Sequence, residues 1–230
     1  MKYFLLFTFL FIQSKSFASE KMLEKIDSYR NPSDSYVMDV GILDVEDKKQ
    51  SKFEVFLKGN EKTLIKTLLP KRDKGRNMLM LGENMWVFIP NLKRAMRVNM
   101  SQKLTGQAAI GDISRMRWAG DYEAVKTTTK GSSEVKLELN SKKKGLTYDK
   151  ITVFAEKNTL KPIRALLKTK SGRVLKRAEY EDFKQVEGSL IPHRMILTDY
   201  LNDKRKSIVT IEKIKSKKLQ DSLFNQRALK

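Results

Sequence analysis

Apolar and polar residues alternate along most of the chain after residue 35. In "SKFEVFLKG" (51–59), Phe53, Val55 and Leu57 alternate with charged residues except at Phe56, a period of two that is typical of a half-buried β-strand. The same alternation continues toward the C-terminus, and turns rich in Gly, Asn, Asp, Ser and Lys separate the alternating segments. The segments that predict strands are 35–46, 51–59, 62–70, 77–89, 94–100, 134–140, 149–158, 160–169, 173–183, 191–201 and 206–214.

Two segments depart from this pattern. "SEKMLEKIDSYR" (19–30) places Met22, Leu23 and Ile26 on one face of a predicted helix that Asn31-Pro32 ends. "SQKLTGQAAIGDISRMRWAGDY" (101–122) has glycines and small residues before Asp112, a candidate N-cap for a short helix. Short turns between successive strands favour antiparallel neighbours. We therefore predict a mainly β (α+β) fold of roughly ten or eleven antiparallel strands that curl into a barrel or half-barrel, whose open mouth the helices can close.

The predicted hairpin 77–89 is apolar on both faces. Leu79, Leu81, Trp86 and Phe88 fall on one face, while the methionines and Val87 fall on the other. A sheet covered on one side alone would alternate apolar and polar residues. Either this hairpin is a central strand pair packed between the opening helix and the core, or one face lines a cavity for an acyl chain, which adaptable methionines suit.

The N-terminus predicts export. Residues 1–18 combine Lys2, an apolar run and a small-x-small ending at Ala18, the features of a cleavable signal peptide. We expect a soluble, exported mature domain at 19–230, with no linker or internal repeat. The whole chain has a formal net charge of +20, from 47 Lys and Arg against 27 Asp and Glu. In an exported protein such charge favours solubility or contact with anionic envelope components, and we expect no nucleic-acid partner.

The residue inventory disfavours an enzyme. The chain has no cysteine and only one histidine, His193, which excludes Cys/His nucleophile pairs and His/Cys zinc sites. It also has no phosphate-binding glycine motif. Pairs of carboxylates that hydrolyse glycans have no fixed spacing and stay possible. We expect no catalytic residues, no metal and no cofactor.

Several motifs resemble those of the LolA-like outer-membrane lipoprotein-sorting proteins. "NMLMLGENMWVFIPNLKRAMRV" (77–98) is similar to that family's strand, Gly turn and Trp-x-aromatic-x-Pro strand leading into a basic segment. "GQAAIGDISRM" (106–116), "YEDFKQVEGSLIPHRMILTDY" (180–200) and "DSLFNQRAL" (221–229) follow in the family's order. The resemblance implies a single open antiparallel β half-barrel of about eleven strands, with helices that close a hydrophobic cavity as a lid. It implies that such a protein carries lipoproteins or lipids across the periplasm. It also implies an inner-membrane exporter as donor and an outer-membrane acceptor.

This resemblance and the residue pattern together suggest a candidate site. Its cavity residues are expected to be Phe53, Val55, Met80, Trp86, Phe88 and Met96, although ordinary core packing explains each equally well. A lid helix is expected to carry Ile113, Met116 and Trp118, with a plain packing helix as the alternative. Basic residues at the mouth, Arg94, Arg97, Arg115 and Arg117, are candidates for head-group or partner contacts. Alternatively, Asp112 forms an ion pair with its arginine neighbours and latches the lid.

Two functions follow. A carrier would shield acyl chains in an apolar pocket during transfer between membranes, with transient contact to the membrane surface. A non-enzymatic envelope adaptor would instead bind an exporter or an anionic envelope component through its basic surface. The discriminating feature is the interior, because a carrier needs several hundred cubic ångströms of apolar space under a movable cover, which an adaptor does not need.

Overall fold

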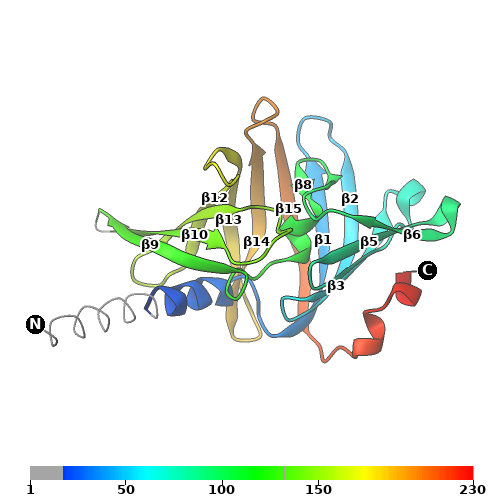
Figure 1. Cartoon of the computed structure of the whole chain (residues 1–230), viewed down its shortest axis with the longest axis horizontal. Helices are drawn as coiled ribbons and strands as arrows, with labels where there is room; N and C mark the ends of the chain where they lie inside the picture. Colours follow the sequence, from blue (N-terminus) through cyan, green and yellow to red (C-terminus); the bar gives the residue numbers. More distant parts are fainter. Residues whose placement is uncertain (1–17, 132, 230) are drawn as a thin grey trace, which may run out of the picture.

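A computed structural model describes residues 18–131 and 133–229. In this part of the chain, thirteen antiparallel strands form one curved sheet (Figure 1) in the order β6-β5-β4-β3-β2-β1-β15-β14-β13-β12-β11-β10-β9. The strands are β1 (Ser35–Asp44), β2 (Gln50–Lys58), β3 (Lys62–Leu69), β4 (Met78–Leu81), β5 (Asn84–Ile89), β6 (Arg94–Val98), β9 (Tyr122–Lys130), β10 (Glu134–Ser141), β11 (Lys150–Glu156), β12 (Pro162–Lys168), β13 (Val174–Val186), β14 (Ser189–Asp199) and β15 (Lys206–Ser216).

The predicted fold class, a mainly β open antiparallel sheet, is confirmed. The strand count exceeds the expected eleven, and the strand that the pattern did not indicate is β9. Its residues 127–129 are three threonines between lysines, so no apolar residues alternate there. Threonine suits a strand because it is β-branched, and β9 is an edge strand with one neighbour, which lowers the need for a buried face.

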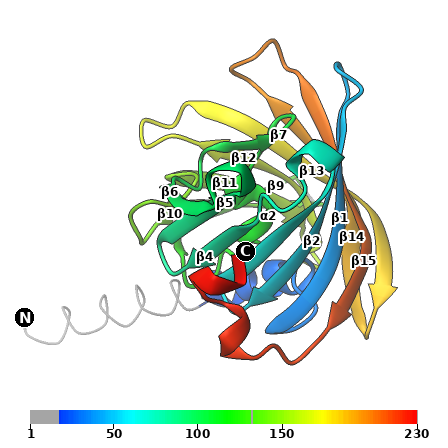
Figure 2. The same ribbon diagram turned by 90° about the vertical axis from the view of Figure 1, so that its right-hand side faces the viewer.

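The chain between the two sheet edges passes across the concave face. Because β6 and β9 are the opposite edges of the sheet, residues 99–121 must connect them, and we call these residues the crossing segment. The segment contains a small hairpin of β7 (Lys103–Thr105) and β8 (Ala108–Ala109), followed by the short helix α2 (Ile110–Ser114). Figure 2 shows the sheet curving around α2. The expected central helical insertion is therefore present, as a single short helix.

The N-terminal helix lies against the same face. Residues 18–28 are helical, which confirms the predicted helix, and Leu23 and Ile26 are fully buried in the core. The expected signal peptide falls outside the described residues except for its last residue, Ala18, so its cleavage stays a prediction. Among the described residues, no helix is both long and apolar enough to cross a membrane.

Apolar residues form two clusters, one on each face of the sheet. The concave cluster joins the inner face of both halves of the sheet to the N-terminal helix and the crossing segment. The convex cluster lies under the C-terminal segment, residues 217–229, which contains the 3-10 turns η3 (Asp221–Leu223) and η4 (Gln226–Leu229) and appears in red in Figure 1. Its buried members are Phe56, Leu64, Leu79, Leu219, Phe224 and Leu229.

This arrangement explains the hairpin with two apolar faces. Met80 pairs with Met85 and both face the concave cluster, whereas Leu79 pairs with Trp86 and both face the convex cluster. The prediction that both faces are covered is thus confirmed. The expected cover was wrong on one point: the second face packs under the C-terminal segment and not under the opening helix. Residues at the end of the chain supply that cover, and local sequence pattern does not reveal such a distant contact.

Candidate functional site

The interior of the half-barrel beneath the crossing segment is nearly filled by side chains. One apolar cavity of about 20 Å³ lies between the crossing segment and the centre of the sheet, lined by Met38, Val40, Ile113, Met116, Pro192 and Met195 among others. A neighbouring cavity of about 40 Å³ is more polar and is lined by Arg115, Trp118, Tyr148 and Tyr180 among others. Ligand pockets usually measure about 300–1,000 Å³. The inner apolar surface is therefore present but covered.

A larger hollow lies outside this interior. It measures about 630 Å³ and is lined by Glu20, Glu24, Asp34, Asn60 and Arg117, among other mostly polar residues. Its acids lie beside the N-terminal helix and the end of the crossing segment. Such a lining suits water and cations better than an acyl chain. Apolar cargo would therefore have to occupy the space that the crossing segment now fills.

A buried carboxylate of the N-terminal helix holds the end of the crossing segment. Asp27 Oδ2 accepts hydrogen bonds from the backbone N–H groups of Trp118 and Ala119, both at 2.6 Å. Its Oδ1 lies 3.3 Å from the Arg30 guanidinium, which stacks 3.7 Å from the centre of the Trp118 ring. Burial raises the pKa of Asp27 to about 6, although Arg30 and the two N–H groups oppose this shift. This group thus titrates in a mildly acidic range.

A second tie combines a buried ion pair inside the crossing segment with one contact from Lys143 outside it. Arg115 Nε lies 2.7 Å from Asp121 Oδ2, and Lys143, just after β10, lies 3.0 Å from Asp121 Oδ1. Asp121 is fully buried and Arg115 is 9% exposed. Removing one partner of such a pair leaves a charge without compensation in a low-dielectric interior. The pair therefore fixes both ends of residues 115–121.

A third tie joins α2 to the opposite half of the sheet. Asp112 accepts a hydrogen bond from the Tyr148 hydroxyl at 2.6 Å and pairs with Lys176 on β13 at 2.9 Å. Burial and the Asp112 carboxylate raise the pKa of Tyr148 well above its usual value. An ion pair of Asp112 was expected, but with Arg115 or Arg117. The expected partner was wrong: Asp112 pairs instead with Lys176, which the fold brings near from a strand distant in sequence.

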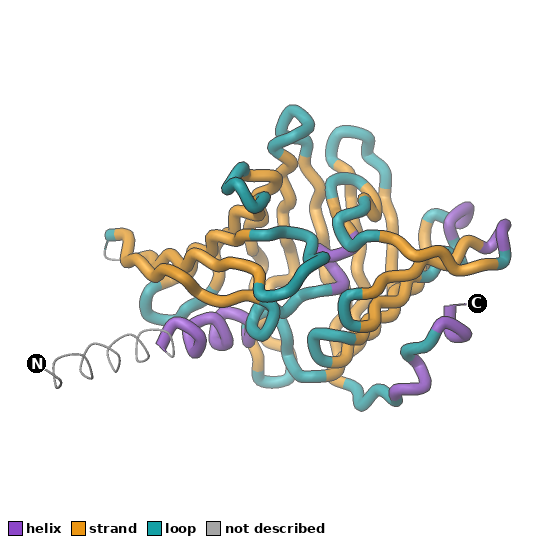
Figure 3. Tube along the Cα trace, viewed as in Figure 1, coloured by secondary structure: helices purple, strands orange, loops and turns teal. Residues whose placement is uncertain are grey.

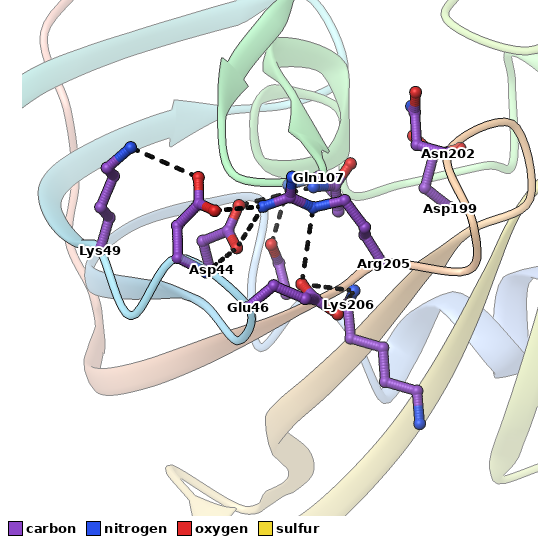
Figure 4. Close-up of polar contacts among 10 residues, drawn as sticks. Asp44, Glu46, Lys49, Gln107, Asp199, Asn202, Arg205 and Lys206 are labelled. Atoms are coloured by element: carbon purple, nitrogen blue, oxygen red, sulfur yellow. Dashed lines mark hydrogen bonds and ion pairs between the residues drawn. The ribbon is translucent and has the colours of Figure 1, made fainter.

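Polar contacts also fasten the β7–β8 hairpin to the rim of the sheet. Ser207 Oγ accepts a hydrogen bond from the Gln107 backbone N–H at 2.8 Å, and the Gln107 side chain reaches Asp44. Figure 4 shows Arg205 beside Asp44 and Glu46 in the same network. Ser51 and Thr105 hydroxyls lie 3.0 Å apart at the adjoining strand. The crossing segment is thus tied to the sheet largely through polar groups.

The six expected cavity residues do not gather in one place. Phe53, Val55 and Met80 lie together in the concave cluster and are almost fully buried. Trp86 and Phe88 lie on the other face and pack against the convex cluster. Met96 is 39% exposed on the edge strand β6. The expectation of one cavity containing all six is wrong in this respect, because neighbours one residue apart in a strand point to opposite faces.

The expected lid residues do gather. Ile113, Met116 and Trp118 are buried in the concave cluster as part of the crossing segment. Only Ile113 is in α2; the other two follow it in extended chain. Whether these residues move as a lid stays a prediction.

The four expected head-group arginines are split between two sites. Arg94 and Arg97 are exposed on β6. Arg115 is buried in its pair with Asp121, and Arg117 pairs with Asp34 at 2.8 Å. Among residues 18–131 and 133–229, no group of three or more His, Cys, Asp or Glu side chains is placed to hold a metal ion.

The residues that hold the crossing segment in place were not predicted from the sequence. Asp27 and Arg30 were assigned only to the opening helix, and Tyr148 and Lys176 were not singled out. One signal was available for Asp27, which occupies the position after Ile26 near the apolar face of an amphipathic helix. Arg30 lies three residues after Asp27, a spacing that brings both side chains together on a helix. Tyr148 and Lys176 meet Asp112 only through the tertiary fold, so no local sequence pattern predicts their contacts.

Comparison with known proteins places the fold. A family model described as "uncharacterized protein" matches residues 59–230. No curated protein matches the chain. Among solved structures, a LolA superfamily protein from Nitrosomonas europaea has 31% identity, covers 91% of this chain and 98% of its own, and gives a TM-score of 0.83.

Two further structures share the fold at 19% identity. A putative outer membrane lipoprotein-sorting protein domain from Vibrio parahaemolyticus covers 93% of this chain and 99% of its own, with a TM-score of 0.74. A DUF1329 family protein from Desulfovibrio piger covers 94% of this chain and 99% of its own, with a TM-score of 0.76. With its open thirteen-stranded sheet and its match to the Nitrosomonas protein over nearly the full chain, the protein belongs to the LolA superfamily.

Proposed function

We propose that the protein is a periplasmic carrier that shields the acyl chains of a lipoprotein or lipid during transfer between membranes. The observation that carries this proposal is the apolar concave face, which is covered by a segment outside the main sheet. Polar contacts tie this segment to β13, to Lys143 and to the N-terminal helix. In this proposal the structure is the closed state. The crossing segment is the movable cover, and the concave cluster is the acyl-chain site.

The energetics require such a cover to move. An acyl chain of about sixteen carbons costs on the order of 12 kcal/mol to leave in water, at ~0.8 kcal/mol per methylene. Cavities of about 20 and 40 Å³ cannot hold it. Cargo must therefore replace the apolar side chains of the crossing segment, above all Ile113, Met116 and Trp118, against the sheet.

Polar ties suit a cover that must open reversibly. Removing one partner of a buried ion pair strongly destabilises the folded protein. The intact pair, however, contributes little net free energy relative to two solvated charges. When the crossing segment moves outward, Asp112, Asp121 and their partners regain water. The main cost of opening is then the exposure of apolar surface, which incoming acyl chains would cover again.

The similar structures support the cargo class and location. The Vibrio structure carries the description of a lipoprotein-sorting domain, and the residues 1–18 of this chain have the pattern of a signal peptide. The proposed partners are an inner-membrane exporter as donor and an outer-membrane acceptor. The proposed function involves no chemistry on the cargo.

A disulfide lock tests the movement of the cover. The Ser51 and Thr105 hydroxyl oxygens lie 3.0 Å apart, so the double variant Ser51→Cys/Thr105→Cys would fasten the β7–β8 hairpin to β2. The chain has no other cysteine to interfere. Binding of a fluorescent fatty acid and of a triacylated peptide would be measured in oxidised and reduced protein. We expect binding by the reduced form and at least tenfold weaker binding by the oxidised form.

Each single-cysteine variant under oxidising conditions is the control, because it carries the substitution without the lock. A Trp86→Phe background leaves Trp118 as the only tryptophan, whose emission would report movement of the crossing segment. Equal binding by locked and unlocked protein would show that the crossing segment is not the cover.

The filled interior also favours a second function, the envelope adaptor. Such a protein needs no large cavity and would bind an exporter or an anionic envelope component through its basic surface. Native mass spectrometry of protein purified from its own periplasm without detergent separates the two. A bound lipid or acylated peptide supports the carrier. A clean apo mass that persists after incubation with envelope lipids and acylated peptides supports the adaptor.

A further inference from the structure

Two loops come together at the end of the sheet beside the edge strand β6. The first loop follows β3 and contains the 3-10 turn η1 (Lys71–Asp73); the second joins β5 to β6 and contains η2 (Pro90–Leu92). Gly75 of the first loop lies close to the Pro90 ring of the second, since a Cβ built on Gly75 would be 3.4 Å from Pro90 Cγ. Figure 3 shows the two turns adjacent at the right-hand end of the molecule. We call residues 68–76 and 90–97 the tip.

The tip concentrates positive charge. It contains seven cationic side chains and one acid, Asp73, whose carboxylate already lies 3.5 Å from Arg76 and 3.6 Å from Arg72. All seven cations are exposed: Lys71, Arg72, Lys74, Arg76, Lys93, Arg94 and Arg97. Such a density of one charge sign on a protruding end creates a strong local attraction for an anionic surface.

The tip also exposes large apolar side chains between these cations. Leu92 is 52% exposed, Leu68 40%, Met96 39% and Leu69 37%. These four are half of the eight large hydrophobic residues that are exposed in the described part of the chain. Exposed apolar residues scattered singly need no explanation, but a group at one end of the sheet indicates an interaction site.

We propose that the tip docks the protein on an anionic phospholipid bilayer. Leu92 and Leu68 enter the head-group boundary while the surrounding lysines and arginines contact lipid phosphates. This surface lies outside the concave cluster, so docking does not depend on whether the cover opens or on what the cargo is. For a carrier, it would bring the sheet edge at β6, where the crossing segment begins, to the membrane.

The mixture of residues in the tip favours a bilayer over a protein partner. Leu92 lies in the turn η2, Leu68 and Leu69 lie at the end of β3, and Met96 lies on the edge strand β6, with exposed cations near each of them in sequence. Protein interfaces concentrate apolar contact in a core that excludes charge, whereas the tip intersperses leucines and cations. This mixture is typical of segments that lie in the membrane interface.

Vesicle cosedimentation tests the proposal with the mature protein. Vesicles of phosphatidylglycerol mixed with phosphatidylcholine would be compared with pure phosphatidylcholine at low and at physiological salt. We expect binding to the anionic vesicles alone, weakened by salt because exposed charges are screened. The variant Lys74→Glu/Arg94→Glu should bind at least about 25-fold more weakly, at roughly fivefold per lost cation.

Matched controls separate location from total charge and apolarity. Lys217→Glu/Lys218→Glu changes the charge equally at exposed positions of the C-terminal segment. Val125→Glu replaces a residue on β9 that is 52% exposed, the same fraction as Leu92. Leu92→Glu should weaken binding and Val125→Glu should not. Circular dichroism would confirm that every variant is folded, and Leu92→Ser would replace a Leu92→Glu variant that does not fold.

Three outcomes would overturn the proposal. The first is no binding to anionic vesicles by the unaltered protein. The second is equal weakening by the tip and control variants, which would show that net charge alone drives association. The third is that the unaltered protein binds an envelope protein but no vesicles, and that the tip variants lose this protein binding. The tip would then be a protein interface.

Discussion

The two faces of the sheet are covered in different ways. On the concave face, the charged groups that hold the crossing segment are buried. Asp27 contacts the segment from the N-terminal helix, and Asp121 pairs inside the segment with Arg115 and outside it with Lys143. On the convex face, the C-terminal segment is held by Leu219, Phe224 and Leu229, and its charged contacts lie at the surface. Asp221 there pairs with Lys58 and Lys62, and these hydrogen bonds lower its pKa to about 2.

One sheet can thus carry a permanent cover and a removable one. An apolar anchor loses its full transfer free energy when it leaves the core, so the convex cover is expected to stay in place. Buried ion pairs gain hydration when they open, which offsets part of the cost. Movement is therefore expected on the concave side.

The largest effect is expected from Asp121→Asn. The substitution leaves Arg115 buried without its partner and should lower the free energy of unfolding by about 3–5 kcal/mol. Urea unfolding followed by circular dichroism measures this loss. Asp221→Asn is the matched control, since it removes a carboxylate from two surface lysines and should change stability little. Equal losses for the two variants would mean that the concave ties are hydrated and the comparison fails.

A somewhat smaller effect is expected from Phe224→Ala. Phe224 is 4% exposed in the convex cluster, and its truncation should cost about 3 kcal/mol, the lower end for a buried Phe, because a terminal segment can relax into the gap. In a Trp118→Phe background, emission from Trp86 should shift to longer wavelength. Binding of a fluorescent fatty acid should not change. Lost binding would place the cargo site on the convex face.

The smallest effect is a change in the pH dependence of stability through Asp27. Burial raises its pKa from 3.8 to about 6, so between these values the folded protein keeps a proton that the unfolded chain releases. This group therefore stabilises the fold at low pH and loses that contribution as pH rises from about 4 to 6, by about 2–3 kcal/mol.

Asp27→Asn should remove this contribution while keeping an oxygen that accepts from the Trp118 or Ala119 N–H. Unfolding at pH 4, 5, 6 and 7 would compare the two proteins, because the carboxylates with lowered pKa, such as Asp44 and Asp221, act equally in both. Parallel stability profiles for the two proteins would show that Asp27 is ionised throughout this range, and that the crossing segment is held by a permanent charge.

Much of the fold could be predicted from residues near one another in sequence. Alternation at Phe53, Val55 and Leu57 indicates a strand because successive side chains point to opposite faces. The hairpin 77–89 showed that both faces are covered, and Asn31-Pro32 marked the end of the opening helix. The strand β9 was not predicted because its threonines show no alternation of apolar and polar residues. This edge strand is stabilised by its single neighbour, and the sequence shows no strand pattern there.

The candidate site likewise contains residues that local sequence predicts and residues that it does not predict. Ile113, Met116 and Trp118 could be predicted to lie together because they are close in the chain and apolar. Trp86 and Phe88 could not be assigned to the correct cluster, since a two-faced strand does not reveal which face is concave. Asp27, Asp121 and Lys176 could not be assigned as ties, because each meets partners brought near by strand order.

The sequence by itself thus determined the antiparallel strands, the opening helix, the interruption between the two halves and the excess of positive charge. These depend on periods of two and on the conformations that glycine and proline allow, which are local properties. Only the tertiary structure decided that β6 and β9 are the edges and that residues 99–121 cross between them. It also decided which charges are buried, because burial depends on surface removed from water by segments far apart in the chain.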